Sequence, residues 1–406
     1  MSTLKVDNIR HNNATTDALV LSNDGSVAIG TCTAKLTSVG GAQLSHRNLQ
    51  VNGAMIIAQK ATTDTGSEGL ATVDKFGLST GGEDEDLTQA QVDVASGTTP
   101  FSLGFRKAYK ITNGNQTSGA GADDRAIVHT TYESQDIANS GWNYTSSTGF
   151  ITLSYWAKSS VAQTFYLALT THDGSSYRYA SPITFTSADT WTKFTHKIPG
   201  NSNLQFDQDA GRGLQMYWTL FRGTNTTDNS FTINQWAAYN GSIRYPDITS
   251  TWWTTNDSTF ELTGVQFEVG EIATSFEHRS RGDELARCQR YCVVYGSDQE
   301  MHLGTANAYN STNINLSIHV PVAMRAKPNA SVVLATSGDN ANKWLQAYMG
   351  ATGVKSNASI SVSDCSEGHA QMRLYLQNAH SGLSVGQALW CHTLPDAKLI
   401  LAADSF

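Results

Sequence analysis

Apolar and polar residues alternate with a period of two along several segments of this chain. Within residues 150–157 and 214–220, the apolar positions that share one face are Ile151, Leu153, Tyr155 and Ala157, and then Leu214, Met216, Trp218 and Leu220. The alternation returns at Ile314, Leu316, Ile318 and Val320, and again at Met372, Leu374 and Leu376. Because side chains of a strand point alternately to its two faces, each pattern predicts a half-buried β-strand.

The spacing of these strands predicts an all-β fold. Gly-, Asn- and Ser-rich loops separate them, and no helical periodicity lies between them, which favours a jelly-roll-like β-sandwich over residues 51–278. Seven of the nine tryptophans fall between Trp142 and Trp253, inside this range. A second, smaller β-sandwich domain is expected over residues 293–406.

The first 50 residues are expected to form a β-rich segment of a different kind. Asp24 and Gly25 separate two short apolar runs, residues 18–21 and 27–29, which predicts a hairpin. Strands so few and short bury little apolar surface, so we expect them to pair with other subunits or with a larger assembly.

One short helix is predicted to connect the two large domains, over residues 279–292. Leu285, Cys288 and Cys292 follow a helical spacing, and Asp283 stands four residues before Arg287, where the two can form an ion pair.

Composition excludes several classes of protein. Charged residues make up 15% of the chain and the net charge is −8, with no Lys/Arg run, so no nucleic-acid partner is expected. No apolar stretch has the length that a bilayer crossing needs, and the N-terminal residues lack a signal-peptide pattern, so we expect synthesis in a cytoplasm and no membrane insertion. Five scattered cysteines predict reduced thiols.

Four segments carry a resemblance to a known family. The strings TGVQFEVG (residues 263–270), ATSFEHR (273–279) and ELARCQRY (284–291) resemble a junction in tail-fibre and tail-appendage proteins of tailed phages. SYWAKSS (154–160) and DTWTKF (189–194) look like strands of the carbohydrate-binding-module-like jelly roll that precedes this junction. STLKVDNI (2–9) is similar to the starts of structural proteins of marine cyanophages, and HVPVAMRAKP (319–328) is similar to the family's distal domain.

The resemblance implies a homotrimeric virion component. It would be attached to the phage tail or to an adaptor protein through residues 1–50, and its C-terminal domain would face polysaccharide on the host cell surface. In the family the helix continues into an aromatic pair, whereas here Cys292 follows Tyr291.

Two groups of residues are candidates for binding surface glycan, lipopolysaccharide or capsule. Trp252 and Trp253 read as part of a loop, and polar groups flank them, the candidates being Arg244, Tyr245, Asp247, Trp252 and Trp253. The distal candidates are Tyr309, Trp344, Tyr348 and Arg373. Sugars bind by placing CH faces on aromatic rings and hydroxyls on polar side chains. Aromatic residues also fill cores and subunit interfaces, which is the more frequent setting.

The metal candidates rest on residue type alone. Asp123 and Asp124, and Asp207 and Asp209, offer oxygen ligands for a structural calcium ion, and no other cofactor is expected. Cys288 with Cys292, Cys365 with His369, and Cys391 with His392 offer zinc ligands, although the chain has no CxxC pair.

No catalytic motif occurs in the sequence, and we expect no enzymatic activity. Two alternatives remain. A polysaccharide-degrading tailspike would need two carboxylates across a groove, a spacing that sequence does not reveal. A purely structural tail connector would bury all its aromatic residues and make no receptor contact.

Overall fold

The alternating segments form antiparallel β-strands, which confirms the all-β prediction. The computed structural model describes residues 8–9, 19–21, 27–29, 46–364 and 370–404. On β9 (Phe150–Ser159) and β13 (Arg212–Arg222), the eight apolar residues predicted to share a face are completely buried. The predicted faces of β18 (Ile314–His319) and β23 (Gln371–Gln377) are buried as well.

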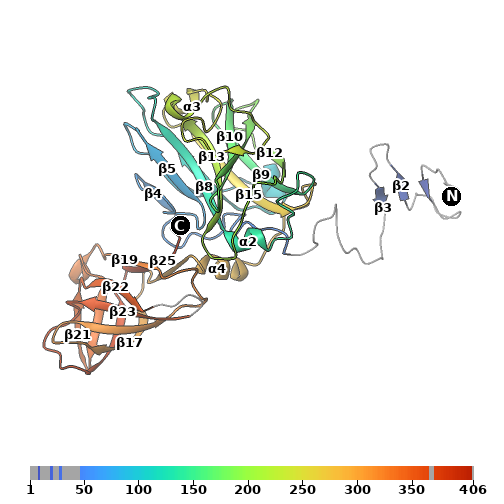
Figure 1. Cartoon of the computed structure of the whole chain (residues 1–406). Helices are drawn as coiled ribbons and strands as arrows, with labels where there is room; N and C mark the ends of the chain where they lie inside the picture. Colours follow the sequence, from blue (N-terminus) through green and yellow to red (C-terminus); the bar gives the residue numbers. More distant parts are fainter. Residues whose placement is uncertain (1–7, 10–18, 22–26, 30–45, 365–369, 405–406) are drawn as a thin grey trace.

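Two six-stranded sheets pack face to face to form the larger body (Figure 1). In sheet order, the first contains β14 (Ala237–Ala238), β11 (Tyr177–Thr184), β10 (Thr164–Thr171), β13, β8 (Arg125–Glu133) and β5 (Gly77–Gly81). The second contains β12 (Thr192–Pro199), β9, β15 (Thr259–Val269), β7 (Lys107–Thr112), β6 (Thr88–Asp93) and β4 (Thr63–Thr65).

Aromatic side chains fill the space between these two sheets. Trp218 lies at the centre, with ring centroids 6.1 Å from Phe76 and 5.6 Å from Tyr155. Short helical turns close the connections between strands: α1 (Thr99–Ser102), α2 (Ser134–Ala138), η1 (Thr224–Thr226) and α3 (Thr251–Thr254). Burial of many large rings is the main driving force for this body.

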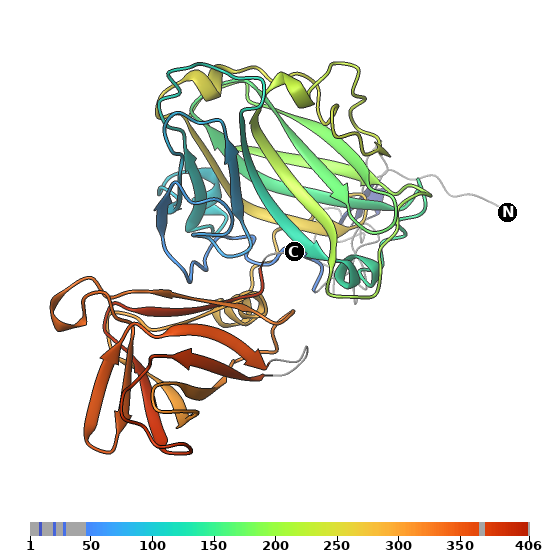
Figure 2. The same ribbon diagram turned by 60° about the vertical axis from the view of Figure 1, so that its left-hand side comes forward.

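A second body lies below the first in the views of Figures 1 and 2. Its small sheet has the order β16 (Cys292–Tyr295), β25 (Lys398–Ala402) and β19 (Asn329–Val333). Its large sheet has the order β21 (Thr352–Ser356), β20 (Leu345–Met349), β24 (Ala388–Thr393), β17 (Met301–Ala308), β18, β23 and β22 (Ser359–Asp364). A short turn, η2 (Gly338–Asn340), precedes β20. Its own apolar core centres on Trp344, which is completely buried.

The connecting helix is shorter than the sequence predicts. α4 spans Arg281–Gln289, and the side chain of Ser280 caps it by accepting a 3.1 Å hydrogen bond from the backbone N–H of Asp283. Cys292 is the first residue of β16, so the predicted helical face ends before it. Within the described residues no ion pair joins Asp283 to Arg287, because the Asp283 carboxylate accepts from the Ser280 hydroxyl at 2.8 Å instead.

Polar contacts fix the two bodies to each other on either side of α4. Arg290 donates two hydrogen bonds of 2.7 Å to the buried carboxylate of Glu133, and Lys60 pairs with Asp404 at 2.6 Å. Burial alone would raise the pKa of Glu133, but the hydrogen bonds from Arg290 oppose it and the pKa is lowered. Arg325 donates to the backbone oxygens of Ala210 (2.7 Å) and Ala403 (3.0 Å). These contacts bridge both bodies.

The predicted N-terminal hairpin is confirmed by strand pairing. β2 (Leu19–Leu21) pairs antiparallel with β3 (Val27–Ile29), and β1 (Asn8–Ile9) joins β2 on its other edge. The turn residues 22–26 lie outside the described residues. In the described ranges no helix combines the length and apolarity that a membrane crossing requires.

Candidate functional site

Trp252 and Trp253 belong to the core, and their prediction as loop residues is wrong. Both lie in α3 and both indoles are completely buried. Their ring N–H groups donate to the backbone oxygens of Thr259 (3.1 Å) and Gly119 (3.0 Å). Neither ring offers a face to a ligand, because a four-residue helical turn places both indoles inside the sandwich.

Tyr245 is also buried, whereas its neighbours in the same loop remain accessible. Its ring lies 4.4 Å from the guanidinium of Arg178, and its hydroxyl accepts a 2.6 Å hydrogen bond from that group. Asp247 is exposed, but its carboxylate holds the loop by accepting from Thr227 and Asn229, each at 2.8 Å. Arg244 is half-buried and donates to the backbone oxygen of Gly241.

Arg244 is one of four arginines that gather over the outer face of the sheet containing β11 and β13. The others are Arg178, Arg212 and Arg222; we call the four the arginine face. They influence one another electrostatically: burial, then Arg244 and Arg178, lowers the pKa of Arg222. Burial, then Arg212 and Arg178, lowers the pKa of His172 to about 4. Within the described residues none of the four forms an ion pair with a carboxylate.

The distal candidates divide into a buried residue and an exposed group. Trp344 is completely buried and donates from its ring N–H to the backbone oxygen of Ala358 at 2.8 Å, so its predicted binding role is wrong. Tyr309 is 59% exposed, and its ring packs edge-on against Tyr375, 5.5 Å away.

Strand register places Tyr348 and Arg373 in one line across the exposed face of the seven-stranded sheet. Tyr348 on β20 pairs with Trp390 on β24, and Trp390 pairs with Thr305 on β17. The pairing Ala306↔Leu316, continued by one residue, sets Thr305 beside Ser317 on β18, and Ser317 pairs with Arg373 on β23. We call Tyr348, Trp390, Thr305, Ser317 and Arg373 the exposed row.

The exposed row combines a large aromatic surface with polar groups. Trp390 is 52% exposed and its ring centroid lies 6.3 Å from that of Tyr348. At roughly 4.8 Å per strand, Arg373 stands about 14 Å from Trp390. Arg373 is held by an ion pair with Asp364 and by a 3.1 Å hydrogen bond to Ser363. An aromatic platform with a positioned guanidinium can hold the CH face of a ring and the hydroxyls beside it.

Trp390 was missed by the sequence prediction. It lies between Leu389 and Cys391, which are both buried. Alternation within residues 388–393 would have placed Trp390 on the opposite, outward face, and that was the available signal.

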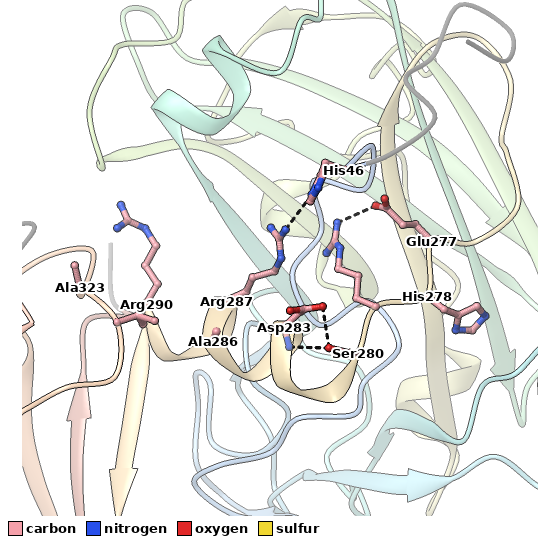
Figure 3. Close-up of a pocket in the computed structure, with 11 residues that line it drawn as sticks. His46, Glu277, His278, Ser280, Asp283, Ala286, Arg287, Arg290 and Ala323 are labelled. Carbon is pink, nitrogen blue, oxygen red and sulfur yellow. Dashed lines mark hydrogen bonds and ion pairs between the residues drawn. The ribbon is translucent and has the colours of Figure 1, made fainter. Parts of the chain in front are cut away.

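A pocket with a volume of about 580 Å³ lies beside α4 and is drawn in Figure 3. Its basic side chains already have partners. Arg279 pairs with Glu277 at 3.1 Å and with Glu284 at 3.0 Å, and Arg290 pairs with Glu133. Arg287 points toward His46, with 3.5 Å between their nitrogens, as Figure 3 shows. These charges serve the junction between the two bodies.

The metal candidates act as loop supports in the structure. Asp124 accepts from the backbone N–H of Gly121 at 2.6 Å and Asp209 from that of Gly211 at 2.9 Å. Asp123 and Asp207 accept from the side chains of Asn225 and Gln205. Among the described residues no three His, Cys, Asp or Glu side chains are grouped to hold a metal ion. Cys288, Cys292 and Cys391 are buried free thiols, while Cys365 and His369 lie outside the described residues.

No protein-family model matches this chain, and no curated protein matches it either. Solved structures similar to it include the enzymatically active domain of tailspike protein 4 of bacteriophage CBA120, at 9% identity and a TM-score of 0.29; the match covers 55% of this chain and 21% of that one. The family 11 carbohydrate-binding module of Clostridium thermocellum is 10% identical, with a TM-score of 0.23, over 53% of this chain and 98% of that one. The xylanase 10B modules of Clostridium thermocellum are 10% identical, with a TM-score of 0.25, over 55% of this chain and 30% of that one. Likenesses at these identities and TM-scores carry no conclusion about function.

Proposed function

We propose that this protein is a tail-appendage subunit of a tailed phage that binds cell-surface glycan and catalyses no reaction. The observation that carries the binding proposal is the exposed row, in which Trp390 and Tyr348 form an aromatic platform in line with Arg373. The tail-appendage part is supported by the resemblance of residues 263–291 to the family junction. Localisation in the virion tail, homotrimerisation and attachment through residues 1–50 belong to the same proposal.

Binding by an exposed aromatic platform is physically reasonable for a weak, repeated contact. A half-exposed indole loses little conformational freedom when a ligand lands on it, because only two side-chain torsions are fixed. If one assembly carries several such sites, binding at one site raises the effective concentration of ligand at the others. The overall affinity can then be high although each site is weak.

The arginine face supports a preference for negatively charged glycan. The chain as a whole carries a net charge of −8, yet these four guanidinium groups have no carboxylate partner among the described residues. Positive charge gathered on one face of an acidic protein attracts phosphate or carboxylate groups of a polysaccharide.

The test is binding of the fluorescently labelled full chain to immobilised bacterial surface polysaccharides, with Trp390→Ala beside the wild type. We expect saturable binding, weakened at least about tenfold by the substitution because Trp390 supplies the stacking surface. Val385→Ala is the matched control, since Val385 is an 80% exposed apolar residue of the same body outside the exposed row.

Three outcomes would contradict the proposal. Equal binding by Trp390→Ala and the wild type would remove the exposed row from the function. Binding to no polysaccharide at all would favour the structural connector. Release of reducing ends from a bound polysaccharide would favour a degrading tailspike.

A further inference from the structure

A hollow opens on the outer face of the second jelly-roll sheet, far along the chain from the exposed row. It has a volume of about 260 Å³ and is lined in part by Phe105, Ser154, Trp156, Lys193, Phe276 and His278. We call it the bulge pocket, because an irregularity in β15 creates it.

The bulge arises where β15 passes β9. Thr263 pairs with Trp156 and Gln266 pairs with Ser154, so one extra residue of β15 is accommodated between them. Gly264 occupies this bulge with φ of +63°, and a Cβ on it would come within 2.6 Å of the Phe105 ring. Bulges of this kind re-aim neighbouring side chains and are frequent beside functional sites.

The walls of the bulge pocket are aromatic. Phe105, Phe276 and His278 form a cluster with ring centroids 4.8–5.2 Å apart. Trp156 lines another part of the pocket and is only half-buried. These surfaces are wide enough for one sugar ring and offer flat apolar faces to its CH groups.

Two polar side chains at the pocket, Ser154 and Lys193, form no side-chain hydrogen bond or ion pair within the described residues. The Ser154 hydroxyl is on a residue only 5% exposed, yet it makes no hydrogen bond with any described residue. Lys193 is exposed, stands directly across from Trp156 in the strand pairing, and forms no ion pair within the described ranges. A hydroxyl at the pocket wall can hydrogen-bond to a ligand, and an ammonium without a carboxylate partner favours a negatively charged one.

The pocket beside α4 differs in this respect. There Arg279 and Arg290 are already paired with carboxylates, and Arg287 contacts His46. In the bulge pocket much of the wall is aromatic, and Ser154 and Lys193 remain available to a ligand.

We infer that the bulge pocket binds a single sugar ring that carries a carboxylate, a hexuronic acid residue. The ring packs on Trp156, the carboxylate pairs with Lys193, and a ring hydroxyl hydrogen-bonds to Ser154. This inference rests on the proposed function in taking glycan as the ligand class, but it uses a separate site on the other body.

The test is titration of the full chain with D-glucuronate and with D-glucose, followed by saturation-transfer NMR. We expect glucuronate to bind with a Kd of about 1 mM, typical of one small ring, and glucose to bind about tenfold more weakly. Lys193→Gln should remove the preference for glucuronate and leave glucose binding unchanged. Ser154→Ala should weaken both about threefold, and Trp156→Ala should abolish both.

Lys110→Gln is the matched control, because Lys110 lies on β7 of the same sheet, does not line the pocket and forms no ion pair within the described residues. Failure of glucuronate to bind the wild type, or equal binding by Lys193→Gln and the wild type, would overturn the inference.

The two proposals fail separately. If Trp390→Ala loses polysaccharide binding while glucuronate still binds, both sites stand. If polysaccharide binds through Trp390 but glucuronate does not bind, the bulge pocket alone is refuted. If neither binds, both proposals are refuted.

Discussion

At the residue scale, the same side chain serves opposite purposes in different settings. Trp253 is completely buried and stacks on Phe221 with ring centroids 5.3 Å apart, whereas Trp390 is 52% exposed. The polar residues flanking Trp252 and Trp253 suggested a binding loop, but the carboxylate of Asp247 holds its own loop by accepting from Thr227 and Asn229. Residue type therefore indicated chemistry without indicating exposure.

His196 provides a residue-scale test of stability against pH. It is buried between the hydroxyls of Tyr155 (3.1 Å) and Ser181 (3.0 Å), and burial lowers its pKa from 6.5 to about 4. As the pH falls below about 6.5, His196 therefore binds a proton in the unfolded chain but stays neutral in the folded chain until about pH 4. The stability held above pH 6.5 is lost as the pH falls toward 4.

We expect the wild type to lose about 2 kcal/mol more unfolding free energy between pH 7 and pH 5 than His196→Gln does. Urea unfolding at the two pH values measures this difference. The exposed His319→Gln variant should follow the wild type. A pH response identical in His196→Gln and the wild type would show that folding does not lower the pKa of His196.

At the element scale, alternation predicted which faces of the strands are buried, and it did so from local sequence alone. On β13, the buried face of Leu214, Met216, Trp218 and Leu220 was predicted correctly. The opposite face, which carries Tyr217 on β13 and Arg178 on β11, with β10 between the two strands, was visible in the same alternation. The sequence did not show which segment covers this face. The segment is the loop that bears Tyr245, which lies more than 25 residues after Tyr217 in the chain.

The exposed row escaped prediction for a similar reason. Tyr348 and Arg373 were candidates, but only the pairing of β20, β24, β17, β18 and β23 aligns them with Trp390. The register between strands that are separated by long connections depends on the packing of the whole sheet. It could not be predicted from a single sequence.

The bulge in β15 is testable as an element. Gly264→Ala adds a methyl group at φ of +63° against the Phe105 ring, which should lower the unfolding free energy by about 1–3 kcal/mol. Denaturant unfolding measures the loss. Gly282→Ala is the control, because Gly282 lies in α4 and a Cβ there would meet only the Ser280 Oγ, at an ordinary 3.9 Å, so alanine should be neutral or stabilising. An unchanged denaturant midpoint for Gly264→Ala would mean that β15 can lose its bulge and accommodate the methyl group without a loss of stability.

At the scale of the whole molecule, the junction binds two bodies whose cores are separate. Lys60, Glu133 and Ala210 on the first body contact Asp404, Arg290 and Arg325 on the second. These partners are more than 100 residues apart in sequence, which is why the domain order could be proposed from sequence while the contacts between the domains could not.

Arg325 is the residue whose loss should uncouple the bodies. It is 7% exposed and donates to backbone oxygens on both sides of the junction. We expect the described body pair to unfold in one calorimetric transition, and Arg325→Met to split it into two or to broaden it markedly. Lys327→Met, an exposed neighbour, should keep one transition. A single sharp transition in Arg325→Met would show that the remaining contacts suffice.

The position of β25 in the small sheet has a consequence for how the protein is made. β25 is the central strand, and both β16 and β19 pair only with it within the described part of the sheet. A ribosome reaches Lys398 roughly 100 residues after completing Tyr295, which takes about 5–20 s at ordinary elongation rates. The jelly roll can therefore fold during translation, while the small sheet of the second body forms only after β25 has emerged. Termination upstream of β25 would release chains with a finished first body and an unpaired, aggregation-prone β16.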